Sequence, residues 1–354
     1  MVQLSHKKHV KLVNDYEAAA AAANLVYVSD QEPGISRVKK DNIFSYFQVQ
    51  KLIKDKNILD RIKRLAIPPA WEKVWICTKD NGHIQATGYD VRLRKQYRYH
   101  SSWHLLRNET KFHKLLEFSK VLPELRAQVE KDLALAELCE RKVLAAVIKL
   151  MECTFIRVGN SEYEKSNGSH GITTMHDKHV KIDGAQISFS FKGKKSIQHD
   201  ISIRSKKLAK VVKQCRDIPG KELFQYYDKD NQRKSIDSGM VNNYIKELTG
   251  DYFTAKDFRT WAGCLHLLTA FKDMDIAENN TSCKKNINAA LDYVSRQLGN
   301  TRTVCKKYYV HPGLIRLYEE NRLDKCLQAI DVPCDMQTSF SKEEVVLMKL
   351  LSQV

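Results

Sequence analysis

Two hydrophobic patterns divide the chain, one typical of strands and one typical of helices. Before about residue 108, apolar residues gather in short runs such as 74–77 and 82–86, and the Asn81-Gly82 pair between these runs is a turn signal. We expect a β-hairpin there. From about residue 111, apolar residues recur every three or four positions, as in the stretch 125–133, and this spacing predicts helices.

A β island interrupts the helical half of the chain. A short apolar run at 179–182 precedes two segments, 187–191 and 197–203, in which apolar and polar residues alternate. Turn residues separate these runs, so the pattern predicts three strands joined by two turns. The second turn contains Gly193-Lys194-Lys195, and we therefore expect Lys194 at the tip of a hairpin.

The remaining periodic segments predict helices, and Pro123 suits the first turn of one of them. Gly299 follows the last periodic residue of another, as a glycine after a helix often does. The predicted helices cover 17–23, 143–151, 208–215, 240–248, 258–271 and 287–298. The fold class expected is α+β: a small mixed, β-rich N-terminal domain, residues 1–108, and a mainly helical domain, residues 109–354, that holds the three-stranded β island.

The composition of the chain is strongly basic. Lys and Arg number 59 against 42 Asp and Glu, a formal net charge of +17. Such an excess favours an acidic partner, nucleic acid first and an anionic membrane surface second, although a merely solvated basic face remains an alternative. No apolar run reaches the roughly 20 residues of a membrane span, and the first residues lack the apolar stretch of a signal peptide.

Cysteine and histidine spacing indicates neither a metal site nor a disulfide framework. The nine cysteines form no CxxC pair, and the twelve histidines form no HExxH motif. Reduced thiols in a cytosolic protein are the simplest interpretation. We therefore predict no metal and no cofactor.

Two arginines stand in segments suited to a phosphate. Arg157 follows an apolar helix and precedes Gly159 in FIRVGN, and a guanidinium fork matches phosphate oxygens. Arg259, in KDFRTWAG, falls early in a predicted helix, where free backbone N–H groups also favour an anion. Asp257 beside it is a candidate cap or orienting residue. Taken alone, Arg157 is equally consistent with a surface residue that caps a helix.

Two further segments supply the other groups that breaking a DNA strand without metal or water requires, an acid and a nucleophile. Lys194 at its turn can reach into a groove and donate a proton, although most lysines in turns are only solvated. The stretch LGNTRTVCKKYYVHPG contains Tyr308 and Tyr309 among basic residues. A tyrosine hydroxyl with its ordinary pKa of about 10 is a weak nucleophile, and neighbouring cations stabilise its phenolate.

The ordered set of Arg157 in FIRVGN, Lys194 in FKGK, Arg259 in KDFRTWAG and Tyr309 in LGNTRTVCKKYYVHP resembles the type IB DNA topoisomerase family. The resemblance is greatest to the small poxvirus-like and bacterial branch and spans roughly residues 30–320. It implies a catalytic domain of the kind shared with tyrosine recombinases, and relaxation of supercoiled DNA without metal or ATP. In that reaction a transient single-strand nick carries a 3′-phosphotyrosyl bond, the free strand rotates, and the nick is religated.

The resemblance also assigns roles. Tyr309, immediately before VHP, would be the nucleophile, and Tyr308 a neighbour. Arg157 and Arg259 would neutralise the phosphate, and Lys194 would protonate the leaving 5′ oxygen. Nine residues before the nucleophile the poxvirus pattern has a histidine, whereas this chain, like bacterial members, has an asparagine there, Asn300. An amide can donate to a phosphate oxygen but cannot become cationic, so we expect some stabilisation of the transition state from Asn300 and no histidine-type pH dependence of the rate.

The N-terminal half resembles the DNA-clamping domain of the same branch, in IPPAWEKVWIC (67–77) and HIQATGYDVRLRKQYRYH (83–100). Polar, basic and aromatic side chains mix in the second segment, as base and phosphate contacts require. An ordinary strand pair with a solvated basic face is the alternative. The expected hinge of the clamp is 101–110. The residues predicted to bind DNA are Gln85, Tyr89, Arg92, Lys95, Tyr97, Arg98 and, beyond this segment, Tyr163.

Two other functions remain open. A tyrosine recombinase uses the same chemistry, but its second arginine usually stands in an HxxR setting, whereas Lys256 lies three residues before Arg259 here. A non-catalytic DNA-binding protein would use the cations only to hold phosphates. The family resemblance implies a monomer that closes around double-stranded DNA, without a membrane, in a bacterial cytoplasm or a viral factory.

Overall fold

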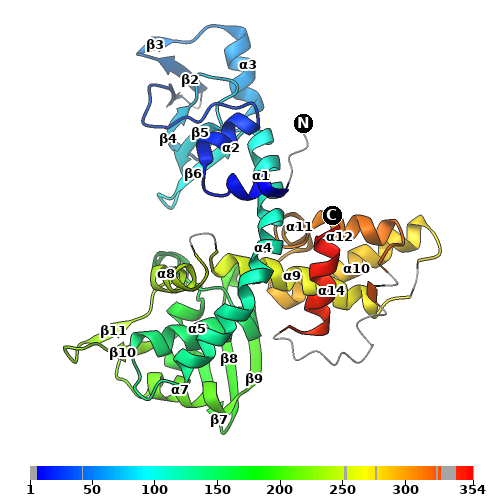
Figure 1. Ribbon diagram of the computed structural model, residues 1–354. Coiled ribbons are helices and arrows are strands. Elements are labelled where there is room, and N and C mark those ends of the chain that lie inside the picture. Colours follow the sequence, from blue (N-terminus) through cyan, green and yellow to red (C-terminus); the bar gives the residue numbers. More distant parts are fainter. Residues whose placement is uncertain are drawn as a thin grey trace. The chain divides into compact units, whose positions relative to one another are not determined.

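The computed structural model (Figure 1) describes residues 6–41, 43–250, 253–275, 277–323, 326–327 and 340–353. The chain divides into two compact units, Met1–Lys114 and Leu115–Val354. This division falls inside one helix of 33 residues, α4 (Ser101–Leu133). No helix within the described ranges combines the length and the apolar character that crossing a bilayer requires.

Helix α4 corrects the expectation for Pro123, which lies in the interior of this helix and not in the first turn of a new one. The segment 101–110, expected as the hinge of the clamp, forms the first turns of α4. A proline inside a helix costs about 3 kcal/mol because it removes a hydrogen bond and crowds the preceding turn. Burial of the flanking Leu122 and Leu125, each 1% exposed, favours continuing the helix.

The first unit is built on a six-stranded antiparallel sheet in the order β3-β2-β1-β4-β5-β6. Its strands are β1 (Ile35–Lys40), β2 (Ile43–Gln48), β3 (Lys51–Leu52), β4 (Glu72–Ile76), β5 (Ile84–Tyr89) and β6 (Lys95–Tyr99). The predicted hairpin is confirmed as the β4–β5 pair. Three helices accompany the sheet: α1 (His6–Lys11), α2 (Tyr16–Ala22) and α3 (Lys56–Arg64). The alanine-rich segment forms α2 as expected.

The second unit contains most of the helices and the β island. Its helices are α5 (Glu140–Thr154), α6 (Ser161–Asn167), α7 (Lys206–Arg216), α8 (Ser238–Thr249), α9 (Ala255–Lys272), α10 (Asn280–Leu298), α11 (Arg302–Tyr308), α12 (Pro312–Glu319) and α14 (Lys342–Leu351). The island is confirmed as the antiparallel sheet β7 (Val180–Asp183), β8 (Gln186–Lys192) and β9 (Gln198–Arg204). A short ribbon of β10 (Gln225–Tyr227) and β11 (Arg233–Ser235) was not predicted. The fold is therefore mixed α and β with antiparallel sheets.

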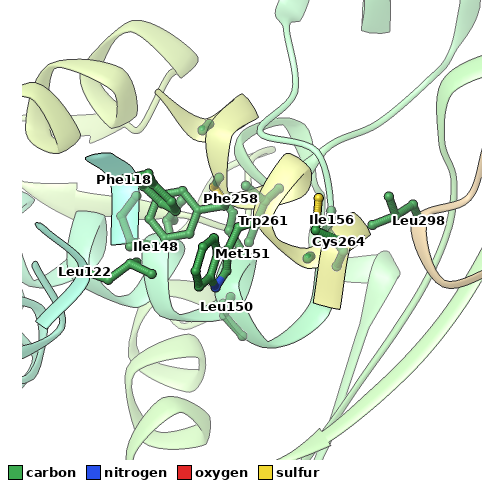
Figure 2. Packing of buried hydrophobic residues seen from close by; sticks show 14 of the residues in the cluster. Phe118, Leu122, Ile148, Leu150, Met151, Ile156, Phe258, Trp261, Cys264 and Leu298 are labelled. Atoms are coloured by element: carbon green, nitrogen blue, oxygen red, sulfur yellow. The ribbon is translucent and has the colours of Figure 1, made fainter. Parts of the chain in front are cut away.

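The core of the second unit forms where α4, α5 and α9 meet (Figure 2). Phe118 of α4 packs edge-on against Phe258 of α9, with ring centroids 5.1 Å apart, and lies 6.3 Å from the ring of Trp261. Helix α5 buries residues around most of its circumference, including Ile148 and Met151. These contacts fix the end of α5 and the start of α9, the two places from which the candidate arginines project.

A buried charge cluster ties α14 to this core. The Glu344 carboxylate accepts hydrogen bonds from both terminal nitrogens of Arg126, at 3.0 and 2.6 Å, and from Trp261 Nε1 at 2.9 Å. Glu344 is 4% exposed, and Glu152 pairs with Arg126 at 2.6 Å. Burial alone would raise the pKa of Glu344, but the Arg126 and Trp261 hydrogen bonds outweigh burial and lower that pKa.

We predict that Glu344→Ala lowers the free energy of unfolding by about 1–3 kcal/mol, because it leaves the buried Trp261 N–H and two donors of the partly buried Arg126 without their acceptor, while Glu152 still pairs with Arg126. In the wild-type protein this contribution is present above the ordinary glutamate pKa. It is lost as the pH falls through the lowered folded-state pKa. Urea unfolding of both proteins over a pH series measures the difference.

Lys349→Ala, an exposed change on the same helix, should alter the free energy of unfolding by no more than about 0.5 kcal/mol. Equal effects of the two substitutions would contradict the role assigned to the Glu344 cluster.

Candidate active site

One cleft of about 550 Å³ in the second unit brings together every residue predicted to take part in the chemistry. It is lined by Arg157, Val158, Lys194, Lys195, Ile197, Ala255, Lys256, Arg259, Gly299, Asn300, Thr301, Val304, Tyr308 and Tyr309. These residues come from four segments that lie far apart in the sequence, so only the fold assembles them.

Arg157 projects from the chain just after α5. Phe155 ends the helix in the left-handed conformation, and the chain then runs extended beside 171–173, where the Ile172 N–H donates to the Arg157 carbonyl at 2.8 Å. Glycine is required here, because a Cβ on Gly171 would lie 2.4 Å from the Gly159 Cα. Gly159 and Gly171 therefore let two backbone segments touch behind the arginine.

Arg259 lies one turn into α9, after a capping box in which Asp257 accepts from the Thr254 backbone N–H at 2.8 Å. The expectation that Asp257 caps this helix is confirmed. The Arg259 guanidinium donates to the carbonyl of Phe155 and, at 2.7 Å, to the carbonyl of Leu298. Its Nε is buried and has no hydrogen-bond partner among the described residues.

Asn300 follows the left-handed Gly299 that ends α10, as predicted. Its Oδ1 accepts a hydrogen bond from Arg157 at 2.7 Å, which fixes the amide orientation. The other amide atom, Nδ2, is buried and lacks an acceptor within the part of the chain described. Buried donors without acceptors are rare, so Asn300 Nδ2 and Arg259 Nε are both suited to an anion in the cleft.

Tyr309 sits at the C-terminal end of α11, where its backbone N–H donates to the Cys305 carbonyl at 2.9 Å. The Arg259 guanidinium lies 5.3 Å from the centre of its ring. Gly263 of α9 allows this approach, because a Cβ there would lie 2.4 Å from the Tyr309 carbonyl oxygen. The close contact between α9 and this backbone thus presents the phenol to the arginines.

The charges around Tyr309 favour its phenolate. Burial by itself raises the pKa of the phenol, but Arg259, Arg157 and Lys256 outweigh burial, so the pKa of Tyr309 falls below its ordinary value. Burial and the nearby Arg259 lower the pKa of Arg157 to about 10. The site therefore holds an excess of positive charge that a phosphate would relieve.

Lys194 stands exposed in the turn between β8 and β9, as predicted. The Gly193 N–H donates to the Ile197 carbonyl at 2.8 Å and closes that turn. Tyr308 also lines the cleft, but the cation near its ring is Lys307 on the same helix, 5.3 Å from the ring centre. The two adjacent tyrosines thus have different surroundings.

Four of the residues predicted to bind DNA lie on two faces of the first unit's sheet. Tyr89 pairs with Lys95, and Thr87 with Tyr97, so Tyr89, Lys95 and Tyr97 share one face. Arg98 pairs with Ala86 on the other face and donates to the Ala66 carbonyl at 2.6 Å.

The remaining three predicted DNA contacts differ in exposure. The Gln85 side chain is 4% exposed, and its amide donates to three carbonyls of the loop that follows β4. Arg92 is exposed at the β5–β6 turn. Tyr163 is 51% exposed on α6 of the second unit.

Sequence reasoning missed two residues that the structure brings to the site. Lys256 lines the cleft one helical turn before Arg259, a spacing that puts both on one face of α9. In the sequence, Lys256 was noted only because it replaces the histidine of the recombinase HxxR setting. His199 of β9 is held near both arginines, and burial with their charges lowers its pKa. Nothing in the alternating pattern of β9 distinguished His199.

Comparison with known proteins identifies the family of the chain. A family model described as eukaryotic DNA topoisomerase I, catalytic core, matches residues 100–331, and one described as bacterial DNA topoisomerase IB, N-terminal domain, matches residues 43–90. The chain is 34% identical to DNA topoisomerase 1B of Acanthamoeba polyphaga mimivirus over 81% of this chain and 88% of that protein. It is 24% identical to DNA topoisomerase 1B of Vaccinia virus (strain Copenhagen), over 67% and 73% of the two chains.

The order of the motifs, the single cleft that unites them and these matches lead to one assignment. This chain belongs to the type IB DNA topoisomerase family.

Proposed function

We propose that this protein relaxes supercoiled double-stranded DNA by transesterification at one phosphate, with Tyr309 as the nucleophile. The observation that carries the proposal is the placement of the Tyr309 phenol beside Arg259 and Arg157, whose charges lower its pKa. The Tyr309 oxygen forms a bond to phosphorus while the bond to the 5′ oxygen breaks. The 3′ end of the nicked strand is then linked to the enzyme.

The two arginines and Asn300 stabilise the five-coordinate phosphorus. Arg157 and Arg259 supply the permanent cations that metal ions provide in other phosphoryl-transfer enzymes, so the reaction needs no divalent ion for charge neutralisation. Asn300 donates from Nδ2, an atom without another acceptor among the described residues. Its fixed amide suits a non-bridging oxygen.

Lys194 is the general acid for the leaving 5′ oxygen. Its exposed position on a short turn lets the ammonium reach a DNA strand laid along the cleft. In religation the 5′ hydroxyl returns its proton to Lys194 and attacks phosphorus, and Tyr309 leaves. Because the phosphotyrosyl bond conserves the energy of the broken phosphodiester, no ATP is consumed.

We propose a different role for each of the two units. We infer that the second unit has the catalytic-domain fold that tyrosine recombinases share with this family, and that the first unit binds the duplex as a clamp. The face of Tyr89, Lys95 and Tyr97, with Arg92 at the neighbouring turn, is the surface proposed for DNA. Gln85 and Arg98 remain predictions, although both side chains already serve internal hydrogen bonds.

The protein is proposed to act as a monomer. The named relatives are viral proteins, which favours a site of viral DNA replication as the place of action.

The relaxation assay separates this function from both alternatives. We predict that the purified protein relaxes a supercoiled plasmid in EDTA without ATP, and that Tyr309→Phe abolishes relaxation while Tyr308→Phe retains it. On a suicide substrate the wild-type protein should become covalently attached to the 3′ end of the nick. Gel electrophoresis of the plasmid and mass spectrometry of the attached peptide measure the two outcomes.

A recombinase or a binding protein would leave a lone plasmid supercoiled, and that result would contradict the proposed function. Attachment of DNA by Tyr309→Phe, but not by Tyr308→Phe, would move the nucleophile by one residue.

Removal of one arginine should nearly abolish strand cleavage. We predict that Arg259→Ala slows single-turnover cleavage by about 10³–10⁵-fold, because a charged clamp of this kind contributes that much to phosphoryl transfer. Arg259→Lys should recover only part of the rate, since an ammonium cannot reproduce the two directed contacts of the guanidinium. Rapid-quench assays measure the rates.

Arg302→Ala is the matched control, because Arg302 lies near Tyr309 in the sequence but pairs with Asp292 instead of lining the cleft. The catalytic role is wrong if a folded Arg259→Ala protein cleaves as fast as Arg302→Ala. Thermal melting of each variant verifies the fold.

A further inference from the structure

Three histidines gather outside the catalytic cleft, in the segment between α6 and β7. One ligand nitrogen from each of His170, His176 and His179 lies within 4.8 Å of the others. The centroids of their rings are separated by 4.9, 4.4 and 5.3 Å. Three imidazoles bound to one tetrahedral zinc ion at the usual Zn–N distance would have centroids about 5 Å apart. The three rings are therefore spaced as such a site requires.

Hydrogen bonds already orient two of the rings as metal ligands. His170 Nδ1 donates to the Thr174 carbonyl at 2.6 Å, and His176 Nε2 donates to the Glu164 carboxylate at 2.9 Å. In a neutral imidazole, each bond leaves the opposite ring nitrogen as the one that can bind a metal ion. A carbonyl or carboxylate on the far nitrogen is the usual outer partner of a metal-binding histidine, because it fixes the ring and raises its basicity.

Metal binding would require a change in the hydrogen bonding of His179. Its Nδ1 accepts a hydrogen bond of 3.1 Å from the His176 backbone N–H, and a metal ion bound at that nitrogen would replace this contact. All three rings are only partly buried, so an ion can reach them.

The charge beside the histidines also suits a cation. The Glu164 side chain is 12% exposed and bridges His176 and Lys221. Asp177 follows His176 in the chain, and its Oδ1 is buried without a hydrogen-bond partner in the described ranges. The Glu164 carboxylate therefore lies against the His176 ring, and the nearby cations Lys221 and Lys178 offset part of its charge.

We propose that His170, His176 and His179 bind one divalent transition-metal ion of the zinc class, with a water molecule as the fourth ligand. Imidazole nitrogen suits zinc and its neighbours in the periodic table, whereas magnesium and calcium prefer oxygen ligands. The sequence analysis predicted no metal site because the H-x5-H-x2-H spacing of these residues matches no familiar motif. The fold of the loop, not the spacing, brings the rings together.

The proposed ion would stabilise the histidine loop, which is hydrogen-bonded to the segments that carry the catalytic groups. The His170 N–H donates to the Lys192 carbonyl at 2.8 Å, two residues before Lys194, and the neighbouring Ile172 N–H donates to the Arg157 carbonyl. Glu164 belongs to α6, which carries the exposed Tyr163. Zinc would thus cross-link the loop behind the cleft without entering the reaction, which fits a role in stability rather than in catalysis.

Calorimetric titration of the EDTA-treated full-length protein with Zn²⁺ tests this proposal. The wild-type protein should bind one equivalent tightly and melt at a higher temperature when zinc is present. His170→Ala/His176→Ala should lose this equivalent and the melting shift. Glu164→Ala, which keeps all three ligands, should bind zinc about 10- to 100-fold more weakly. Melting of each apoprotein shows that the variants are folded.

His100→Ala/His104→Ala is the matched control, because it also removes two histidines, and these lie four residues apart in the first unit, His100 just before α4 and His104 in its first turn. This control should keep the zinc equivalent. Co²⁺ in place of zinc should show no sulfur-to-cobalt charge-transfer band, since no cysteine takes part. The proposal is overturned if wild-type protein binds no zinc tightly, if the His170/His176 variant binds it unchanged, or if the control loses it. A sulfur band, which would assign the ion to cysteine, would also overturn it.

Discussion

Two guanidinium groups of the same charge are held beside one partly buried phenol, and the rest of the second unit makes this possible. Arg259 donates to the carbonyls of Phe155 and Leu298, and Arg157 donates to the Gly299 carbonyl at 3.2 Å. These carbonyls lie at the C-terminal ends of α5 and α10, where acceptors are unpaired and the helix dipole is negative. Helix ends therefore offset the repulsion between the arginines before any phosphate arrives.

This arrangement prepares the site for an anion without a metal ion in the reaction. Electrostatic preorganisation is effective when donors are fixed before the charge develops, because no reorganisation is then needed. The packing of α9 against the backbone of Tyr309, with Gly263 at the contact, keeps the phenol within reach of both cations. A shift of either helix end would separate Tyr309, the proposed nucleophile, from the arginines that lower its pKa.

Much of the fold and of the candidate site could be predicted from the sequence, because strong local sequence patterns determine them. Alternation and turn residues gave the β island with Lys194 at its tip, and Gly299 marked the end of α10 correctly. Pro123 was wrongly predicted to lie in the first turn of a helix, because burial of the residues on both sides of it outweighs the preference of proline for helix starts. Lys256 was missed although its spacing from Arg259 places both residues on one face of α9. His199 and the three-histidine cluster were missed because tertiary packing, and no sequence spacing, brings them to their neighbours.

The central claim is that the arginine cluster lowers the pKa of Tyr309, and titration of that phenol tests it most directly. Carbon-13 labelling of tyrosine Cζ lets NMR follow each phenol over a pH series, and Tyr309→Phe identifies its resonance. The account predicts that this resonance titrates below the ordinary tyrosine pKa of about 10, and that Lys256→Ala moves its titration to higher pH while the exposed Lys306→Ala does not. A Tyr309 that titrates at or above the ordinary value would contradict the account.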